Sequence, residues 1–287
     1  MSKKQILVTG ASGTVGSEVV KQLVAAGANV RAGYRTRRPT IARVETAQID
    51  LATGEGLEAA LAGVETVFLL AGEMDDQAAA EIRVVEAAKR AGVKRLVKQS
   101  VLAAETEAYS FAKIHGQIER AIEASGIPYT FLRPGSFMQN FVTYYGDTIR
   151  RENAFYLPCG EGREAFVDAR DIAAVAARAL TTEGHEGKAY DLLGPEPLSY
   201  AEAAAKLSAV LGRTIQYIDL PDAEFKKAML DTGAPESSVD RLLSLCRYIR
   251  EGHLPKRSSA IKDVTDRDPI SFDQFAHDYA DAWSNAR

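Results

Sequence analysis

Short apolar runs alternate with amphipathic stretches through the first two thirds of the chain. Runs that are apolar on both faces are typical of buried parallel strands, and apolar residues spaced three and four apart are typical of helices. These patterns predict strands over residues 6–9, 29–34, 46–49, 64–70, 93–99 and 129–132. They predict helices over residues 15–26, 75–91 and 110–124. Strands that alternate with helices in this way indicate an α/β fold, a Rossmann-type doubly wound parallel sheet.

The pattern changes after residue 134 and becomes mostly helical. Strands are expected over 165–168, 188–192 and 214–219, and helices over 169–180 and 199–211, the second capped by Ser199. We therefore expect a Rossmann core over residues 1–134 and a smaller, mixed region over 135–287. Residues of about 165–192 are expected to return to the core sheet. Such a region, packed over the carboxyl ends of the strands, is where a substrate pocket would form.

A glycine-rich segment connects the first strand to the first helix. Gly10 allows a tight turn, Gly13 leaves room for a pyrophosphate, and Gly16 lets the helix approach the sheet. The start of the helix adds free N–H groups and a partial positive charge. A tight turn without a ligand is the alternative, but the order strand, loop and helix favours a dinucleotide site. The expected contacts are Gly10, Ser12, Gly13, Thr14, Val15 and Gly16.

The end of the second strand indicates which dinucleotide is bound. An enzyme that uses NAD carries an acidic residue there, whereas this chain has Arg35, Arg37 and Arg38. Arg35 takes the place of the acid, and its planar guanidinium suits a 2′-phosphate. We interpret Arg38 as a surface residue and leave the role of Arg37 open. The pattern favours NADP(H) over NAD(H).

Two further dipeptides follow predicted strands at the same edge of the sheet. Asp50 and Leu51 follow the third strand, where a carboxylate can accept a hydrogen bond from the adenine amino group. An equally good alternative makes Asp50 the cap of the next helix. Ala71 and Gly72 follow the fourth strand, where small residues permit contact between the backbone and the cofactor.

Tyr109 and Lys113 form a Tyr-x-x-x-Lys pair, and Ser100 ends the fifth strand. In short-chain dehydrogenases such a tyrosine gives a proton to a carbonyl oxygen, and the lysine lowers its pKa and holds the nicotinamide ribose. These three residues could form a carbonyl reductase triad. However, Tyr109 lies at or before the start of its helix, and the loop from Ser100 to Tyr109 is short.

Composition narrows the function further. The net charge of −4 indicates no nucleic-acid partner, and no run approaches the ~20 apolar residues of a membrane span. We expect a cytoplasmic protein, monomeric or homodimeric. Cys159 and Cys246 are interpreted as buried or incidental thiols. We expect no metal, and we interpret three of the histidines as surface or structural residues: His185, His253 and His277.

Several segments together resemble the NmrA-like family of atypical short-chain dehydrogenases/reductases. They are the Gly-x-x-Gly-x-x-Gly loop and residues 93–97, 113–119, 124–140 and 187–196, so the resemblance covers nearly the whole chain. That family includes triphenylmethane reductases, NADPH:quinone oxidoreductases and azoreductase-like enzymes. The family usually lacks a working Tyr-x-x-x-Lys. His115 matches its recurrent helix histidine, which either faces the nicotinamide as a proton donor or substrate anchor, or is a packing residue.

The resemblance also implies that residues 134–140 back the nicotinamide and line the substrate pocket. Pro134, Gly135, Phe137 and Ser100 are then cofactor contacts. The implied substrate contacts are Phe137, Met138, Asn140, Phe141 and Tyr144. Plain core packing is the alternative for the apolar ones, and for Met138 it is the preferred interpretation. An aromatic pocket suits a small, flat, hydrophobic acceptor.

Three functions are consistent with these features. The first is an NADPH-dependent reductase of a conjugated acceptor such as a quinone, an azo dye or a triarylmethane dye. The second is a carbonyl or imine reductase that uses Tyr109, Lys113 and Ser100. The third is a redox sensor that binds NADP(H) and a partner protein without turnover.

Overall fold

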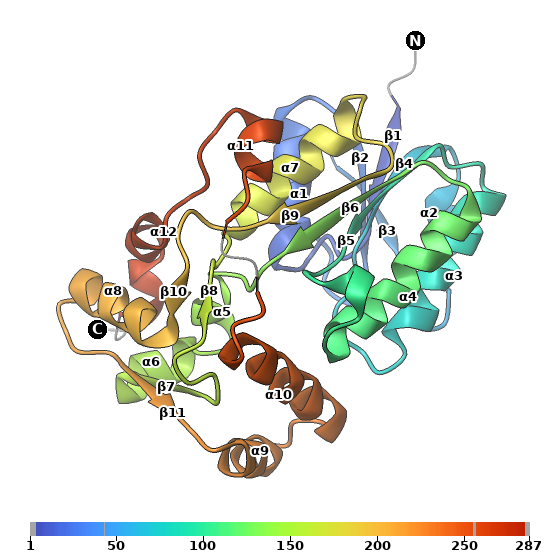
Figure 1. Cartoon of the computed structure of the whole chain (residues 1–287). Coiled ribbons are helices and arrows are strands. Elements are labelled where there is room, and N and C mark those ends of the chain that lie inside the picture. Colours follow the sequence, from blue (N-terminus) through green and yellow to red (C-terminus); the bar gives the residue numbers. More distant parts are fainter. Residues whose placement is uncertain (1–3, 43, 255–256, 285–287) are drawn as a thin grey trace.

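A seven-stranded parallel sheet forms the centre of the molecule (Figure 1). The structure is a computed structural model that describes residues 4–42, 44–254 and 257–284. The strand order is β3-β2-β1-β4-β5-β6-β9, so the chain reverses direction across the sheet between β1 and β4. A ligand crevice is expected at such a switch point. The strands are β1 (Gln5–Val8), β2 (Asn29–Tyr34), β3 (Glu45–Gln48), β4 (Val64–Leu69), β5 (Arg95–Gln99), β6 (Tyr129–Pro134) and β9 (Lys188–Leu192).

Helices cover both faces of this sheet (Figure 1). One face carries α1 (Thr14–Ala25), α7 (Ala169–Thr181) and α11 (Ala260–Thr265), which share one apolar core with β1 and β2. The other face carries α2 (Leu57–Leu61), α3 (Gln77–Arg90) and α4 (Ser110–Ser125), with the short helix η1 (Ala104–Thr106) before α4. Burial on both faces explains why the strand sequences are continuously apolar.

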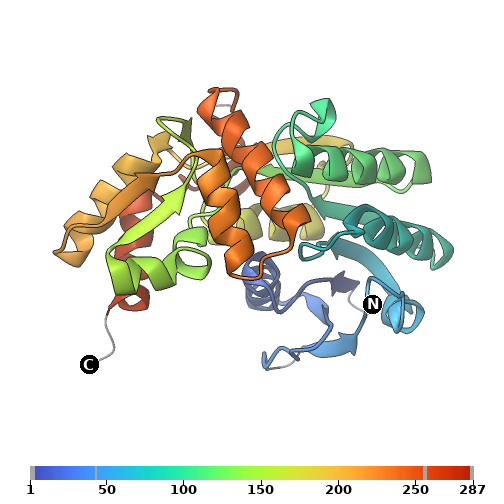
Figure 2. The same ribbon diagram turned by 90° about the horizontal axis from the view of Figure 1, so that it is seen from below.

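The remaining elements surround a third core beside the sheet. They are α5 (Asn140–Thr143), α6 (Gly146–Glu152), β7 (Ala154–Leu157), β8 (Arg163–Glu164), β10 (Leu198–Ser199), α8 (Tyr200–Leu211), β11 (Gln216–Asp219), α9 (Asp222–Asp231), α10 (Glu236–Arg250), α12 (Phe272–Asp278) and η2 (Ala280–Trp283). Strand β7 pairs with β11, and β8 pairs with β10. Figure 2 shows α9 and α10 between this core and the side of the sheet that carries α4.

Phe141 is the centre of the third core. Its ring meets those of Phe155, Phe166 and Phe272 edge to face, with centroids 5.0–5.4 Å apart. The indole N–H of Trp283 donates to the Phe141 carbonyl over 2.7 Å, so the end of the chain closes this core. Edge-to-face aromatic packing adds stability beyond the burial of area.

The α/β fold class is confirmed, and the predicted strands and helices of the sheet are confirmed with ends shifted by at most two residues. The strand predicted over 165–168 is wrong. Only residues 163–164 form a strand, and Val167 makes an isolated bridge to Phe137. The segment is apolar because it is buried, so its pattern could not distinguish a strand from a buried loop. Strand β7 was not predicted, and the division of the chain at residue 134 stays a prediction.

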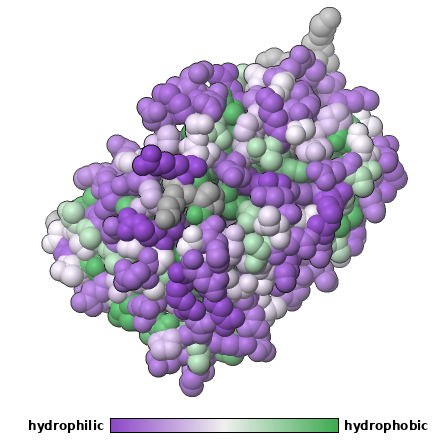
Figure 3. Space-filling view, viewed as in Figure 1, coloured by the Kyte–Doolittle hydropathy of each residue, from purple (hydrophilic) through white to green (hydrophobic). Residues whose placement is uncertain are grey.

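The face shown in Figure 3 is mostly hydrophilic, with apolar residues in small separate groups. Among the described helices, none combines the length and the apolar character that crossing a bilayer requires.

Candidate active site

The glycine loop lies at the switch point, between the end of β1 and the start of α1. Gly10 has a φ of +61°, a conformation that residues with a side chain rarely adopt. A Cβ atom on Gly16 would lie 2.1 Å from the carbonyl oxygen of Gly10, so only glycine lets α1 begin this close to the turn. Gly13 caps α1 without a side-chain hydrogen bond, which leaves the first N–H groups of the helix available to an anion.

Thr9 fixes the other side of the crevice. Its hydroxyl donates to the carbonyl of Leu70 over 2.7 Å and accepts from the backbone N–H of Leu70 over 2.8 Å. The end of β1 is therefore attached to the residue that follows β4. As a result, Ala71 and Gly72 are held beside the glycine loop.

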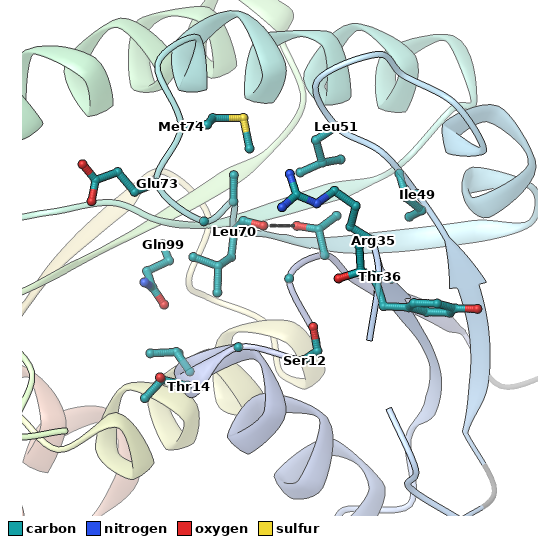
Figure 4. A pocket seen from close by; sticks show the side chains of 18 of the residues that line it. Ser12, Thr14, Arg35, Thr36, Ile49, Leu51, Leu70, Glu73, Met74 and Gln99 are labelled. Atoms are coloured by element: carbon teal, nitrogen blue, oxygen red, sulfur yellow. Dashed lines mark hydrogen bonds between the residues drawn. The ribbon is translucent and has the colours of Figure 1, made fainter. Parts of the chain in front are cut away.

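A cavity of about 470 Å³ opens on this loop (Figure 4). Most predicted cofactor contacts line it: Gly10, Ser12, Gly13, Thr14, Val15, Arg35, Asp50, Leu51, Ala71, Gly72 and Phe137. Gly16 supports the loop from behind. Sequence reasoning missed Gln99, which lines the same cavity, faces into it and has a buried Oε1 atom without a hydrogen-bond partner in the described chain. Its place at the end of β5, directly before Ser100, was the signal that could have identified it.

Arg35 extends from the end of β2 into this cavity, on the side of Leu51 (Figure 4). No acidic side chain of residues 4–42, 44–254 and 257–284 forms an ion pair with it. The guanidinium is thus free to pair with an anionic ligand. Arg37 and Arg38 are exposed and do not line the cavity, which agrees with the surface interpretation of Arg38.

Asp50 has a local structural role, but not the helix cap that was one of the two interpretations. Its Oδ1 atom accepts the N–H of Ala52 over 2.8 Å and closes the turn after β3. Helix α2 begins only at Leu57 and is capped by Gly56 in a left-handed conformation. The capping interpretation is therefore wrong. Asp50 lines the cavity, and its contact with adenine stays a prediction.

A second cavity of about 420 Å³ adjoins the first. The two share four lining residues: Thr14, Glu73, Phe137 and Tyr144. Pro134, Gly135 and Asn140 line only the second cavity, so the predicted cofactor contacts Pro134 and Gly135 do not line the first. Much of the remaining wall is apolar: Val101, Leu102, Phe111, Leu245 and Leu254. The second cavity thus has the position and the lining expected of a substrate pocket.

Met138 and Phe141 line neither cavity, so their predicted contact with the substrate is not supported. Both side chains are buried in the third core. For Met138, core packing was the preferred interpretation. Phe141 is enclosed by other aromatic rings. The short helix α5 turns Asn140 and Tyr144 toward the cavity and Phe141 away from it.

Tyr109, Lys113 and Ser100 do not meet in one cavity. The Tyr109 hydroxyl donates to the carbonyl of Leu102 over 3.0 Å, and burial raises the pKa of this tyrosine. Lys113 is exposed and lines neither cavity. The Ser100 hydroxyl is buried and donates to Glu119 over 2.6 Å. Tyr109 lines the second cavity, whereas Lys113 and Ser100 line neither cavity, so the structure does not bring the three together.

His115 is buried between α4 and the sheet and lines neither cavity. Burial and the nearby ammonium of Lys98 lower its pKa well below the ordinary value, so the ring is neutral. Lys98 itself forms a fully buried ion pair with Glu81 over 2.8 Å. This placement supports the interpretation of His115 as a packing residue and contradicts direct contact with a substrate.

Comparisons with known proteins find related sequences and structures over almost the whole chain. The chain is 39% identical to an NAD(P)H azoreductase of Xenophilus azovorans over 98% of this chain and 100% of that protein. Its structure resembles that of an NADPH-dependent quinone oxidoreductase of Escherichia coli complexed with NADPH, with a TM-score of 0.85 and 28% identity. That match covers 96% of this chain and 99% of the other. A triphenylmethane reductase of Citrobacter sp. complexed with NADP(H) has a TM-score of 0.82, 28% identity and the same coverage.

The chain also matches the model of the NmrA-like family. The match covers residues 2–266, which include both cavities and all the strands of the sheet. The chain therefore belongs to the NmrA-like family.

Proposed function

We propose that this protein is an NADPH-dependent reductase of a small, flat, conjugated acceptor. The observation that carries the proposal is the position of Arg35, which faces a cavity that begins at the glycine loop and continues into a second, largely apolar cavity. The first cavity can hold a phosphorylated dinucleotide, and the second provides room for an acceptor beside it.

The residues of the first cavity fit NADPH. The uncapped first turn of α1 would hold the pyrophosphate, and Arg35 the 2′-phosphate. The orphaned amide oxygen of Gln99 offers an acceptor for a donor group of the dinucleotide. NADPH supplies the hydride when it is bound. The named relatives that use NADPH or NAD(P)H support this choice of cofactor.

The lining of the second cavity supports the proposed class of acceptor. Its apolar walls favour a hydrophobic molecule, and the flat Phe137 ring belongs to both cavities. Tyr144 also belongs to both, and the residue is 74% exposed. An aromatic ring in that position would cover a flat acceptor and exclude water from it. The relatives named for azo, quinone and triphenylmethane chemistry support the same class.

The test is a direct assay of turnover. Oxidation of NADPH is measured with menadione, an azo dye and a cationic triarylmethane dye, each with NADH as the comparison. We expect reduction of at least one acceptor and a preference for NADPH. Binding of NADPH without turnover of any acceptor would contradict the reductase and favour a dinucleotide-binding sensor.

A further inference from the structure

Glu164 is a buried carboxyl group in the wall of the second cavity. It lies in the short strand β8, which pairs with β10 through Leu198, and only 2% of the residue is exposed. The function described above gives this residue no role. A buried carboxyl at a cavity calls for a physical explanation, because burial without compensation is costly.

One oxygen of Glu164 is held in place and the other is not. The hydroxyl of Tyr200 donates to Oε1 over 2.6 Å. Oε2 is buried and receives no hydrogen bond of good geometry within the described chain. Ser136 lies beside the carboxyl and lines the same cavity. Tyr200 therefore fixes the orientation of the group and leaves one oxygen unmatched.

The surroundings of Glu164 favour its neutral form. Burial raises its pKa, and the nearby Ser136 and the hydrogen bond from Tyr200 offset this only in part. The titratable groups that face it are acids that are neutral near pH 7: Tyr109, Tyr145, Cys159 and Tyr200. Among the ion pairs of the described residues, none includes Glu164, so no cation stabilises its charged form.

A neutral carboxyl carries an O–H donor, and a buried donor without an acceptor is unfavourable. We propose that Glu164 is the hydrogen-bond and proton donor of the second cavity, and that the missing acceptor is an atom of the substrate. A carboxyl kept neutral by an apolar site can serve in this way. This inference rests on the proposed reductase function.

The proton balance of the step is simple for a quinone. An acceptor that has gained a hydride from NADPH is an anion, with its charge on the carbonyl oxygen. The O–H bond of Glu164 breaks and an O–H bond forms on that oxygen, which gives the hydroquinone. The Glu164 carboxylate then recovers a proton from water.

The first test observes the carboxyl without turnover. Infrared difference spectra of the wild type and of Glu164→Gln, both saturated with NADP⁺ at pH 7, would isolate the C=O band of Glu164. We expect the band of a protonated carboxyl, and a shift of that band when menadione is added, because NADP⁺ cannot reduce it. A carboxylate band at pH 7 would overturn the proposal and would instead indicate a site for a cationic acceptor.

The second test uses kinetics. Glu164→Leu should lower kcat about 100-fold, because it removes a general acid, and should leave the Kd of NADPH unchanged. Glu164→Gln should still bind menadione in the NADP⁺ complex, since its amide can donate. It should lose the fall in kcat that the wild type shows as pH rises through the pKa of Glu164. Tyr200→Phe removes a hydrogen bond that stabilises the Glu164 carboxylate, so the inflection in the pH profile of its kcat should move to higher pH.

The control is Glu161→Gln, an exposed glutamate three residues earlier, which should behave as the wild type. An active wild type with an unaltered pH profile in Glu164→Gln overturns the role of Glu164. A wild type that reduces no acceptor contradicts the reductase instead, while the infrared band still reports the state of the carboxyl. If Glu164→Leu does not fold, the near-isosteric Glu164→Gln and Tyr200→Phe decide the question.

Discussion

Glu73 and Arg241 form an ion pair of 3.0 Å that attaches the loop after β4 to helix α10. Arg241 also lies 3.5 Å from Asp75, and the hydroxyl of Ser237 donates to Asp75 over 2.6 Å. Glu73 lines both cavities, so this contact connects the sheet to the helical region at the place where the cavities meet.

Arg241→Ala should therefore weaken cofactor binding more than it weakens the fold. Partly exposed ion pairs contribute at most about 1 kcal/mol, so we expect the Kd of NADPH to rise roughly two- to fivefold. Titration of NADPH fluorescence measures this. The matched control is Arg247→Ala on the same helix, which removes an exposed pair with Asp222. Equal effects of the two variants would show that the contact does not position the loop.

Arg35→Ala should reduce the preference for NADPH over NADH. Hydrogen bonds to charged groups contribute about 1.5–3 kcal/mol, which corresponds to roughly a 10- to 100-fold rise in the Kd of NADPH. NADH has no 2′-phosphate, so its affinity should not change. The comparison is Arg38→Ala, an exposed arginine outside the cavity. An equal loss of affinity for NADPH and NADH in Arg35→Ala would contradict a contact with the 2′-phosphate and would place the guanidinium elsewhere on the dinucleotide.

Two alanine substitutions in the glycine loop should separate folding from binding. A Cβ atom at position 16 would lie 2.1 Å from a backbone oxygen, so Gly16→Ala should destabilise the protein by about 1–3 kcal/mol. At position 13 the nearest atom is 3.4 Å away, so Gly13→Ala should fold normally and lose affinity for NADPH. Thermal denaturation and NADPH titration of both variants check this. A stable Gly16→Ala variant would contradict the packing argument.

Tyr109→Phe should change kcat less than about tenfold, because the structure does not place this tyrosine as a general acid. Removal of a positioned general acid would lower kcat at least about 100-fold. Its hydroxyl donates to Leu102, and Lys113 is exposed. Loss of the buried hydrogen bond should cost about 1 kcal/mol of stability. Steady-state kinetics and urea denaturation measure the two effects. A loss of activity by several orders of magnitude would restore the tyrosine acid of a carbonyl reductase.

Asp171 should make stability depend on pH. It accepts the N–H of Ile270 over 2.7 Å, and burial raises its pKa from the ordinary 3.8 to about 6. The charge of Asp168 adds to this rise, and Arg267 and Arg170 oppose it. The folded state therefore holds a proton that the unfolded state releases. Asp171 contributes stability below a pH of about 4, and this is lost as the pH rises through about 6.

The loss corresponds to about 3 kcal/mol, given the rise of the pKa from 3.8 to about 6. Urea unfolding between pH 4 and pH 8 measures it. Asp171→Asn keeps an acceptor for Ile270 and should flatten the curve, whereas the exposed Glu183→Gln should not. Parallel curves for the wild type and Asp171→Asn would contradict the assignment.

The sequence predicted those parts of the site that depend on local structure. Gly10 and Gly16 have roles that follow from one turn and one helix start, and Arg35 follows from the end of one strand. Each of these residues can be located from its own segment, because the edge of a parallel sheet collects the ends of its strands.

Other parts depend on contacts that no local pattern carries. Glu164 enters the second cavity through a two-residue strand whose partner, β10, comes more than thirty residues later. Phe141 and Tyr144 lie three residues apart, yet one is in the core and the other in the cavities, because three aromatic rings from distant segments enclose Phe141. Ser100 ends a strand at the same edge but lines neither cavity, because its hydroxyl turns to Glu119 on a helix packed behind the strand end.

The four residues shared by the two cavities have a consequence for the order of events. Thr14 and Phe137 line both cavities, so a dinucleotide bound in the first would contact residues that also line the second. The bound dinucleotide thereby becomes a wall of the space that the acceptor enters. We therefore expect ordered binding, with the cofactor first and the acceptor second, and release of the oxidised dinucleotide last.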